Sequence, residues 1–494
     1  MTPGFHEFMC ILPECILIFS ALSLIIYSAF TKADHVSLHA TQAVGVAIMA
    51  CALAAISTLL TKGGDAVVFH AMLSTDPYVT FSKAFVLFAA IVTLVMLLPH
   101  LERASLLKPE FPILILFAVV GMLIMVSSQD LMSLFLGVEL QSLSIYVMTA
   151  FAKDDMRSNE AAMKYFVLGS LSSAVLLYGF SLIYGYLGST NFDAIFDALR
   201  QHKDMPISLG LQFAAVLILS GLAFKISAVP FHMWTPDVYE GIPMPLTGFF
   251  AALPKLAAVL MVYRLILGPF APLATTFSGP LIILSIASCF FGSIAGVYQA
   301  QLKRLVAYSS ISHVGFILLG LIAHSTIGVQ GALFYLGVYF LMTIALFTCL
   351  LCLKREGRSV QSIADLRGLN QEHPLMAAVI ALILFSMAGI PPLAGFFGKF
   401  YVILSLVESG SIVTASLAIT SSVIAAFFYI RIVKVMYFDT PSEEEVDGKI
   451  FQHVRLSSGR LILGFCLATL LLMSIAPERF IQKTSHAANH LLHN

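Results

Sequence analysis

Long apolar runs separated by short polar stretches make up almost the whole chain. Each run holds roughly 20 residues, the length that an α-helix needs to cross a hydrocarbon core about 30 Å thick. The pattern predicts about fourteen transmembrane helices. Their bounds are 8–30, 38–61, 81–99, 111–128, 131–152, 161–187, 208–235, 243–268, 275–298, 304–324, 329–353, 373–405, 411–437 and 460–477.

Composition agrees with this pattern. The chain is 59% hydrophobic and only 11% charged, with a mean hydropathy of +0.93, whereas soluble domains are about 25% charged. Unpaired backbone groups are not tolerated in lipid, so the spans are helices or a closed barrel, and runs this continuous exclude the barrel. The sequence therefore predicts an all-α polytopic membrane protein. The first run carries Glu14, expected to be structural or near the outer boundary, and lacks a basic flank, so no cleavable signal is expected.

Lysine and arginine residues divide unevenly between the loops of the two faces. With the N-terminus outside, the inner loops collect most of them, as the positive-inside rule requires. The outer face receives Lys62, Lys83, Arg200, Lys203, Arg264, Arg479 and Lys483. The charge pattern therefore predicts an outward N-terminus.

Four lysines fall inside predicted spans rather than loops: Lys164, Lys225, Lys255 and Lys399. The last three each lie nine or more residues from the nearest loop charge, which is about 13 Å or more along a helix. A lysine stem bridges only part of that distance, so we expect these ammonium groups to face protein or water. Lys164 is four residues from Glu160 and is expected near the inner surface.

Two further polar residues are predicted at the same depth. Glu139 lies nine residues after Asp130, and His313 lies nine residues after Arg304. Charges at a bilayer centre cost a few kcal/mol, and such residues usually face partners or a wet pathway. Their shared depth favours a proton relay. The alternatives are internal ion pairs for the lysines, a protonated hydrogen-bonded carboxyl for Glu139, and a packed polar face for His313.

Prolines interrupt two of the lysine-bearing spans. Pro230 follows Lys225 by five residues, and Gly389, Pro391 and Pro392 precede Lys399. Proline lacks the backbone N–H, so it opens a helix and frees carbonyls that water can reach. One broken helix with a lysine in each half of the chain is typical of an internally repeated transporter.

Motifs for nucleotides and redox centres are missing from the sequence. There is no G-x-G-x-x-G on a strand-to-helix turn, no P-loop and no cysteine cluster for an iron-sulfur centre. Cys349 and Cys352 form a C-x-x-C inside an apolar span without companions, so we interpret them as small helix residues. We expect the chain to bind no metal, cofactor or nucleic acid.

Five stretches carry a resemblance to a known family: "FKISAVPFHMWTPDVYEGIPMPLTGFFAALPK", "FLGVELQSLSIYVM", "EAAMKYFVLGSLSSA", "KRLVAYSSISHVGFILLG" and "AGIPPLAGFFGKFYV". They resemble the antiporter-like membrane subunits of the proton-pumping NADH:quinone oxidoreductase, respiratory complex I. "KYFVLGSLSSA", "TPDVYEG" and the lysine at 399 are most similar to its subunit N branch, the bacterial counterpart of mitochondrial subunit 2.

The resemblance implies roles for individual residues. It pairs Glu139 with Lys225, continues the relay through Lys255, and connects Lys399 to the outer exit. It gives supporting places in the proton path to Lys164, His232 and His313. It also implies helices 1–3 in residues 1–110, inverted five-helix repeats in 111–268 and 273–438 with the seventh and twelfth helices discontinuous, and a cytoplasmic loop, a fourteenth helix and a tail in 439–494.

The implied function is that of a non-redox subunit of this translocase, coupling electron transfer from NADH to quinone to proton pumping. NADH, FMN, iron-sulfur clusters and quinone are then expected elsewhere in the complex. Other membrane-arm subunits, lipid, water and protons are the expected partners. The resemblance favours the bacterial inner membrane, with the mitochondrial inner membrane as the alternative. A cation/proton antiporter subunit, a membrane-bound hydrogenase subunit and a structural scaffold of the membrane arm remain alternatives.

Overall fold

The computed structural model describes residues 4–30, 36–61, 67–103, 106–201, 207–440, 451–453 and 457–493. The chain forms two compact units. Unit 1 comprises residues 1–226, 253–280 and 486–494, and unit 2 comprises residues 227–252 and 281–485. This division follows compactness rather than repetition, so the repeats at 111–268 and 273–438 stay a prediction.

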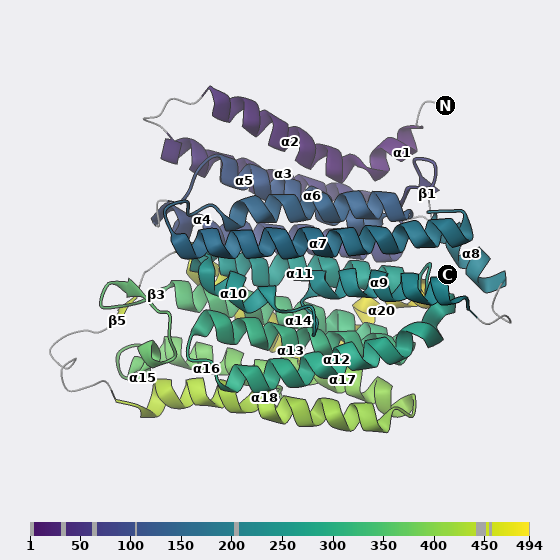
Figure 1. The fold of residues 1–494 in the computed structure, drawn as a ribbon. Helices are drawn as coiled ribbons and strands as arrows, with labels where there is room; N and C mark the ends of the chain where they lie inside the picture. Colours follow the sequence, from purple (N-terminus) through teal and green to yellow (C-terminus); the bar gives the residue numbers. More distant parts are fainter. Residues whose placement is uncertain are drawn as a thin grey trace. The chain divides into compact units, whose positions relative to one another are not determined.

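Unit 1 is a bundle of long helices with one short hairpin. Its elements are α1 (Phe5–Cys10), α2 (Leu12–Ala29), α3 (Val36–Leu60), β1 (Val67–Val68), β2 (Leu73–Ser74), α4 (Pro77–Arg103), α5 (Glu110–Ser127), α6 (Leu131–Thr149), α7 (Met156–Leu187), α8 (Phe192–Gln201) and α9 (Leu209–Ile226). Helix α2 packs on α3 and α5, α5 on α6, and α7 on α9 (Figure 1). Strands β1 and β2 are antiparallel.

Unit 2 is a second helical bundle with a small sheet. Its elements are α10 (Trp234–Gly241), α13 (Leu302–Ile322), α14 (Thr326–Leu351), β3 (Leu353–Arg355), β4 (Arg358–Ser359), η3 (Ala364–Leu366), α15 (Leu369–Glu372), α16 (Pro374–Ala388), α17 (Ala394–Glu408), α18 (Ile412–Phe438), β5 (Phe451–His453) and α19 (Ser457–Ile475). The sheet has the order β4-β3-β5. Helix α14 packs on α13, α17 and α19.

Three helices contribute residues to both units. They are α11 (Met244–Leu267), α12 (Ala274–Val297), which follows the short turn η2 (Ala271–Leu273), and α20 (Pro477–His493). The sequence predicted only a tail after the fourteenth span, so α20 is an element that it missed. Helix α20 is amphipathic rather than uniformly apolar, so a search for apolar runs does not find it.

The predicted fold class is confirmed. Thirteen helices within the described ranges are long and apolar enough to cross a membrane, and Pro374–Ala388 is a shorter apolar helix. The predicted span 373–405 corresponds to α16 and α17 together, so a break accounts for the difference from fourteen. The structure thus has the predicted all-helical, multi-pass architecture.

Both predicted helix breaks are present. Helix α9 ends at Ile226, Ser227 has a φ of 64°, and α10 begins at Trp234. Within this break the Val229 N–H donates to Ser288 Oγ at 2.9 Å. Helix α16 ends at Ala388, and α17 begins only at Ala394.

The second break begins at a glycine with a left-handed conformation. Gly389 has a φ of 88°, a conformation that favours glycine. Its N–H donates to Phe385 O at 3.1 Å and closes the last turn of α16. Pro391 and Pro392 then lack the N–H that would continue the helix.

Glycines allow α5 and α6 to approach closely. A Cβ added at Gly121 would lie 2.6 Å from both Gln141 N and Gly137 O, and one at Gly137 would lie 2.7 Å from Met125 N. These neighbours are backbone atoms of the facing helix, which cannot move aside cheaply. Small residues at such crossings are typical of helices packed in membranes.

We expect Gly121→Ala to destabilise unit 1, because the added methyl overpacks a backbone contact at a cost of about 1–3 kcal/mol. The matched control is Gly45→Ala in α3, where an added Cβ meets nothing within 4 Å. Thermal unfolding of the detergent-solubilised protein should give a lower Tm for Gly121→Ala and an unchanged or higher Tm for Gly45→Ala. Equal Tm values for the two variants would contradict the close approach.

Candidate functional site

Lys225 lies in the last turn of α9 and binds two hydroxyls. Its Nζ donates to Ser142 Oγ at 2.9 Å and to Ser173 Oγ at 3.1 Å. Ser142 is three residues after Glu139 on α6, so the two side chains share one helix face. The partly buried ammonium is therefore held by α6 and α7 together.

Glu139 is an electrostatic neighbour of Lys225, but the two do not form a direct ion pair among the described residues. Its carboxylate atom Oε1 is buried and has no hydrogen-bond partner in the described part of the chain. The structure thus brings Glu139 and Lys225 into one neighbourhood, with the Ser142 hydroxyl on the helix face that connects them. Sequence reasoning did not single out Ser142 or Ser173.

Lys255 is only 2% exposed in helix α11. The helix contains Pro254 directly before it, and a proline leaves the carbonyl four residues earlier without its helical donor. That carbonyl, Phe250 O, accepts instead from Tyr239 Oη at 3.2 Å. Pro254 therefore replaces one backbone hydrogen bond of α11 by a side-chain hydrogen bond, and the helix continues from Met244 to Leu267.

Lys399 occupies the second helix break. It is 5% exposed, and its Nζ donates to Met387 O at 3.2 Å, to Ala388 O at 3.1 Å and to Ser422 Oγ at 2.9 Å. The ammonium also lies 4.9 Å from the ring centre of Phe316. The last carbonyls of α16 have no donor in their own helix and carry the negative end of its dipole, so the break itself supplies partners for the charge.

His313 belongs to a chain of hydroxyl groups in unit 2. Its Nδ1 is 2.6 Å from Tyr335 Oη, and its Nε2 is 3.0 Å from Tyr429 Oη. Tyr429 Oη is in turn 2.5 Å from Ser309 Oγ. Each of these groups can both donate and accept, so the cluster serves as a packed polar face and can also pass a proton.

His313 and Lys399 belong to the same cluster of helices. Phe316, one turn after His313 on α13, lies against the Lys399 ammonium. Tyr335, the partner of His313, packs so closely on α17 that a Cβ at Gly398 would lie 2.3 Å from its ring. Helices α13, α14 and α17 thus hold the two titratable groups in one arrangement.

Two residues predicted to support the proton path, His232 and Lys164, lie outside the contacts described so far. His232 is buried and packs edge-on against Phe291, with ring centres 4.5 Å apart. Lys164 is paired with Glu160 at 2.8 Å, and its side chain is 44% exposed. Its predicted place near the inner membrane surface stays a prediction, and it is more exposed than Lys255 and Lys399, which are buried.

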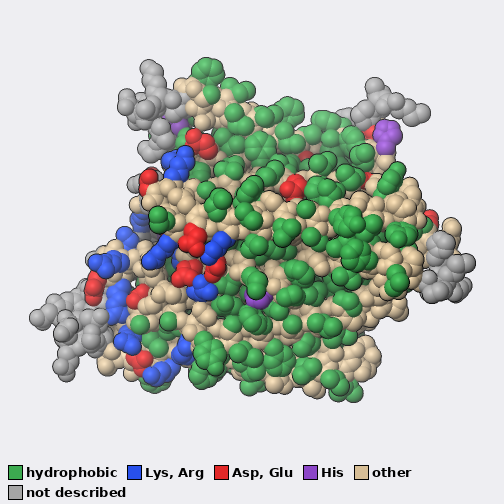
Figure 2. Space-filling view, viewed as in Figure 1, with side chains coloured by type: hydrophobic (Ala, Val, Ile, Leu, Met, Phe, Trp, Pro, Cys, Tyr) green, Lys and Arg blue, Asp and Glu red, His purple; other side chains and the backbone are tan. Residues whose placement is uncertain are grey.

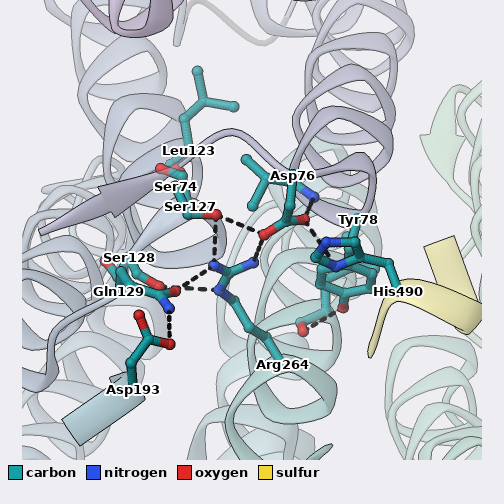
Figure 3. Close-up of polar contacts among 12 residues, drawn as sticks. Ser74, Asp76, Tyr78, Leu123, Ser127, Ser128, Gln129, Asp193, Arg264 and His490 are labelled. Carbon is teal, nitrogen blue, oxygen red and sulfur yellow. Dashed lines mark hydrogen bonds and ion pairs between the residues drawn. The ribbon is translucent and has the colours of Figure 1, made fainter. Parts of the chain in front are cut away.

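The sequence missed a buried network around Arg264 (Figure 3). The Arg264 guanidinium donates to Ser128 O at 3.0 Å, to Asp76 Oδ2 at 2.9 Å, to Ser74 Oγ at 3.0 Å and to Gln129 Oε1 at 2.9 Å. Counting charges assigned Arg264 to an outer loop. It is instead buried in the last turn of α11, and its partner Asp76 is 188 residues away in sequence, a distance that no local pattern reveals.

Asp76 joins this network to the start of α4 and to α20. Its Oδ1 accepts from the Val79 N–H at 2.8 Å and lies 3.7 Å from His490 Nδ1 (Figure 3). Burial raises the pKa of Asp76, but Arg264 together with hydrogen bonds from Ser74 and Val79 outweighs it, so the pKa lies below its usual value. The carboxylate is therefore held in its charged form.

Lys83 was also predicted to lie on the outer face, and the structure corrects this prediction. It is buried inside α4 and pairs with Glu14 of α2 at 2.6 Å. The interpretation of Glu14 as structural agrees with this contact. Lys62 and Lys203, which were counted on the same face, lie outside the described residues.

Comparison with known proteins identifies the family. Residues 128–425 match the sequence profile of the family described as "NADH:quinone oxidoreductase/Mrp antiporter, TM". The chain belongs to this family. Two relatives named NADH-quinone oxidoreductase subunit N, from Paramagnetospirillum magneticum and Rhodospirillum rubrum, are each 44% identical over 92% of this chain and 94% and 93% of their own lengths. The predicted membership of the subunit N branch is confirmed.

Solved structures of the family have the same fold. A chain of respiratory complex I from Thermus thermophilus with bound aureothin is 27% identical, with a TM-score of 0.77, covering 95% of this chain and 98% of that one. A chain of the Mrp complex from Dietzia sp. DQ12-45-1b is 19% identical, with a TM-score of 0.80, covering 100% and 98%. The second likeness concerns the fold alone.

We expect Asp76→Asn to lower the free energy of unfolding by about 3–5 kcal/mol at neutral pH, because it leaves the Arg264 charge buried without its counter-charge. The folded-state pKa of Asp76 lies below its usual value of 3.8, so this stabilisation is complete above that value and is lost as pH falls through the folded-state pKa. Denaturant unfolding of wild type and variant at several pH values checks this.

The control for this prediction is Asp76→Asn combined with Arg264→Gln, which removes both charges. The double variant should lose less stability than the sum of the two single variants. A difference between wild type and Asp76→Asn that stays constant down to the lowest pH would contradict the role of the carboxylate charge.

Proposed function

We propose that this chain is a proton-translocating subunit of the membrane arm of an NADH:quinone oxidoreductase. The observation that carries the proposal is the placement of a lysine at each helix break, the partly buried Lys225 at one and the buried Lys399 at the other. Buried ionisable groups inside membrane helices mark proton and ion pathways. The family and the subunit N names of the relatives supply the enzyme in which such a pathway works.

The first step of the proposed relay belongs to unit 1. A charge change near Glu139 alters its attraction for Lys225, which is worth several kcal/mol at an effective dielectric constant near 20. Weakening this attraction lets Lys225 release its proton. The Ser142 and Ser173 hydroxyls bound to the ammonium can accept one proton and donate another, so they offer the first stage of a transfer toward Lys255.

The last step belongs to unit 2. Lys399 has three acceptors for its three N–H groups, two carbonyls and one hydroxyl, which match an ammonium group. It therefore holds a proton until a change at the helix break, or a charge arriving nearby, releases it. His313 and its tyrosine partners provide an exchange path within the same group of helices.

The redox chemistry is assigned to other subunits of the enzyme complex. NADH, FMN, iron-sulfur clusters and quinone are bound elsewhere, and this chain contributes proton movement. Its partners are neighbouring membrane-arm subunits, lipid and water. The chain lies in a bacterial inner membrane with its N-terminus outside, or in the mitochondrial inner membrane as the alternative.

Other functions give different results in the same assays. A cation/proton antiporter would show Na⁺-dependent transport without quinone reductase activity. A hydrogenase subunit would be found with hydrogenase neighbours. A scaffold of the membrane arm would lose assembly when Lys225 is neutralised, while each assembled complex would pump normally.

We expect Lys225→Ala to reduce both NADH:quinone turnover and proton uptake, because the relay loses the group that responds to the charge of Glu139 and releases a proton toward Lys255. The measurement uses the intact complex in proteoliposomes at matched assembly. Lys164→Ala is the comparison, since Lys164 is half exposed and paired with Glu160; a smaller effect there locates the relay at the buried lysines. Wild-type turnover and pumping in Lys225→Ala would make that lysine structural.

The serine contact has its own test. We expect Ser142→Ala to slow coupled proton uptake by about tenfold, the effect of losing a hydrogen bond to a charged group. Ser144→Ala is the matched control in the same helix. Both hydroxyls donate to the carbonyl four residues earlier, Ser142 to Val138 O at 2.7 Å and Ser144 to Leu140 O at 2.9 Å, but the Lys225 ammonium donates to Ser142. Equal rates for the two variants, measured in assembled complex, would remove Ser142 from the path.

A further inference from the structure

A hollow lined by arginines lies beside the hairpin β3–β4 of unit 2. It has a volume of about 450 Å³, and its lining includes Arg355, Arg358 and Arg367 together with Gln361 and Asp365. We propose that this arginine hollow binds the phosphate group of an anionic membrane lipid. The proposal does not depend on the proton relay, because none of these residues belongs to it.

The hairpin brings two like charges together. Arg355 and Arg358 are directly paired across the antiparallel strands, so their side chains leave the same face of the hairpin. Like charges in this position are destabilising unless something neutralises them. Arg367, which follows η3, lines the same hollow.

The carboxylates of the hollow offset only part of this charge. Asp365 Oδ2 accepts the N–H groups of Gln361 and Ser362 at 2.8 Å each. Burial raises the pKa of Asp365, but these backbone hydrogen bonds, the Ser362 hydroxyl and the nearby Arg355 charge together outweigh it, so the pKa lies below its usual value. Asp365 is thus a charged group that fixes the loop, and Glu356 is the other acid in the lining. The hollow therefore has three arginines and two carboxylates in its lining, and this excess of positive charge favours binding of an anion.

The arginine geometry suits a phosphate. The Arg355 side chain is oriented by a hydrogen bond to Ala364 O at 3.0 Å and by the Phe451 ring, whose centre is 5.9 Å from its guanidinium carbon. Arg358 and Arg367 have no carboxylate partner within ion-pair distance among the described residues. Planar guanidinium groups bind phosphate oxygens in pairs.

The hollow also lies where a lipid headgroup is found. Strand β3 begins two residues after α14 ends at Leu351, and Arg367 comes seven residues before α16 begins at Pro374. The hollow is therefore at the level where the chain leaves the hydrocarbon core. Figure 2 shows Lys and Arg side chains gathered at the end of the bundle that carries β3 and β5. Basic pockets at this level bind anionic headgroups, and this favours a lipid over a free ion.

The test uses the intact, delipidated complex in neutral detergent. A photoreactive phosphatidylglycerol is crosslinked, and the labelled peptides are mapped by mass spectrometry. We expect labelling of the segment 353–367 that unlabelled phosphatidylglycerol competes away and phosphatidylcholine does not. Arg358→Gln should reduce this labelling by about tenfold, as the loss of a charge-assisted hydrogen bond predicts.

The matched control is Lys354→Gln. It removes the same charge one residue from Arg355, at a residue that does not line the hollow, so labelling should persist. Equal labelling in both variants, or none in wild type, would overturn the proposal. Competition by millimolar inorganic phosphate as strong as that by lipid would reject the lipid as the source. If Arg358→Gln does not assemble, Arg367→Gln, which lies outside the strands, gives the same readout.

Discussion

The structure depends on one constraint, that a charge inside the membrane must have hydrogen-bond acceptors. The Lys399 ammonium meets it by donating to the carbonyls of Met387 and Ala388. A charge inside a membrane needs acceptors, and a continuous helix has none to spare because its carbonyls are bonded to its own N–H groups. Breaking the helix frees carbonyls at its end. At Lys399 the broken helix supplies acceptors that the buried charge needs, and the charge satisfies carbonyls that the break leaves open.

Lys225 meets the same constraint by different means. Its partners are hydroxyls from neighbouring helices, Ser142 on α6 and Ser173 on α7. Carbonyls only accept, whereas hydroxyls also donate. The hydroxyls bound to Lys225 can therefore rotate to donate when the lysine loses its proton. The two carbonyls bound to Lys399 can only accept. In the proposed relay this difference makes Lys225 the residue that exchanges protons readily and Lys399 the one that retains a proton until its surroundings change.

Sequence reasoning succeeded where the membrane imposes a local rule. Apolar length gave the helices, and Pro230 and Pro391 gave the breaks. Distance from loop charges correctly indicated that Lys255 and Lys399 are buried, and Lys225 is partly buried. It failed where partners come from distant segments. The pairing of Arg264 with Asp76, or of Lys83 with Glu14, depends on how helices pack, and a charge near a span end looks the same whether it faces water or a buried carboxylate. The sequence analysis also missed the amphipathic helix α20, because a search for long apolar runs does not detect it.

The charges inside unit 1 differ in how many partners hold them, and in the proposed relay this difference separates the fixed charges from the one that carries a proton. Arg264 donates to four acceptors, including a carboxylate whose own second oxygen is bound by a backbone N–H. Moving a proton or a side chain there would leave several buried groups unpaired at once, each at a cost of about 1–3 kcal/mol. Lys225 has two neutral partners and a carboxylate nearby that is not bonded to it. A relay needs such an unsaturated pair, because only incompletely satisfied charges can change partners at low cost, while the saturated Arg264 network keeps the end of α11 fixed.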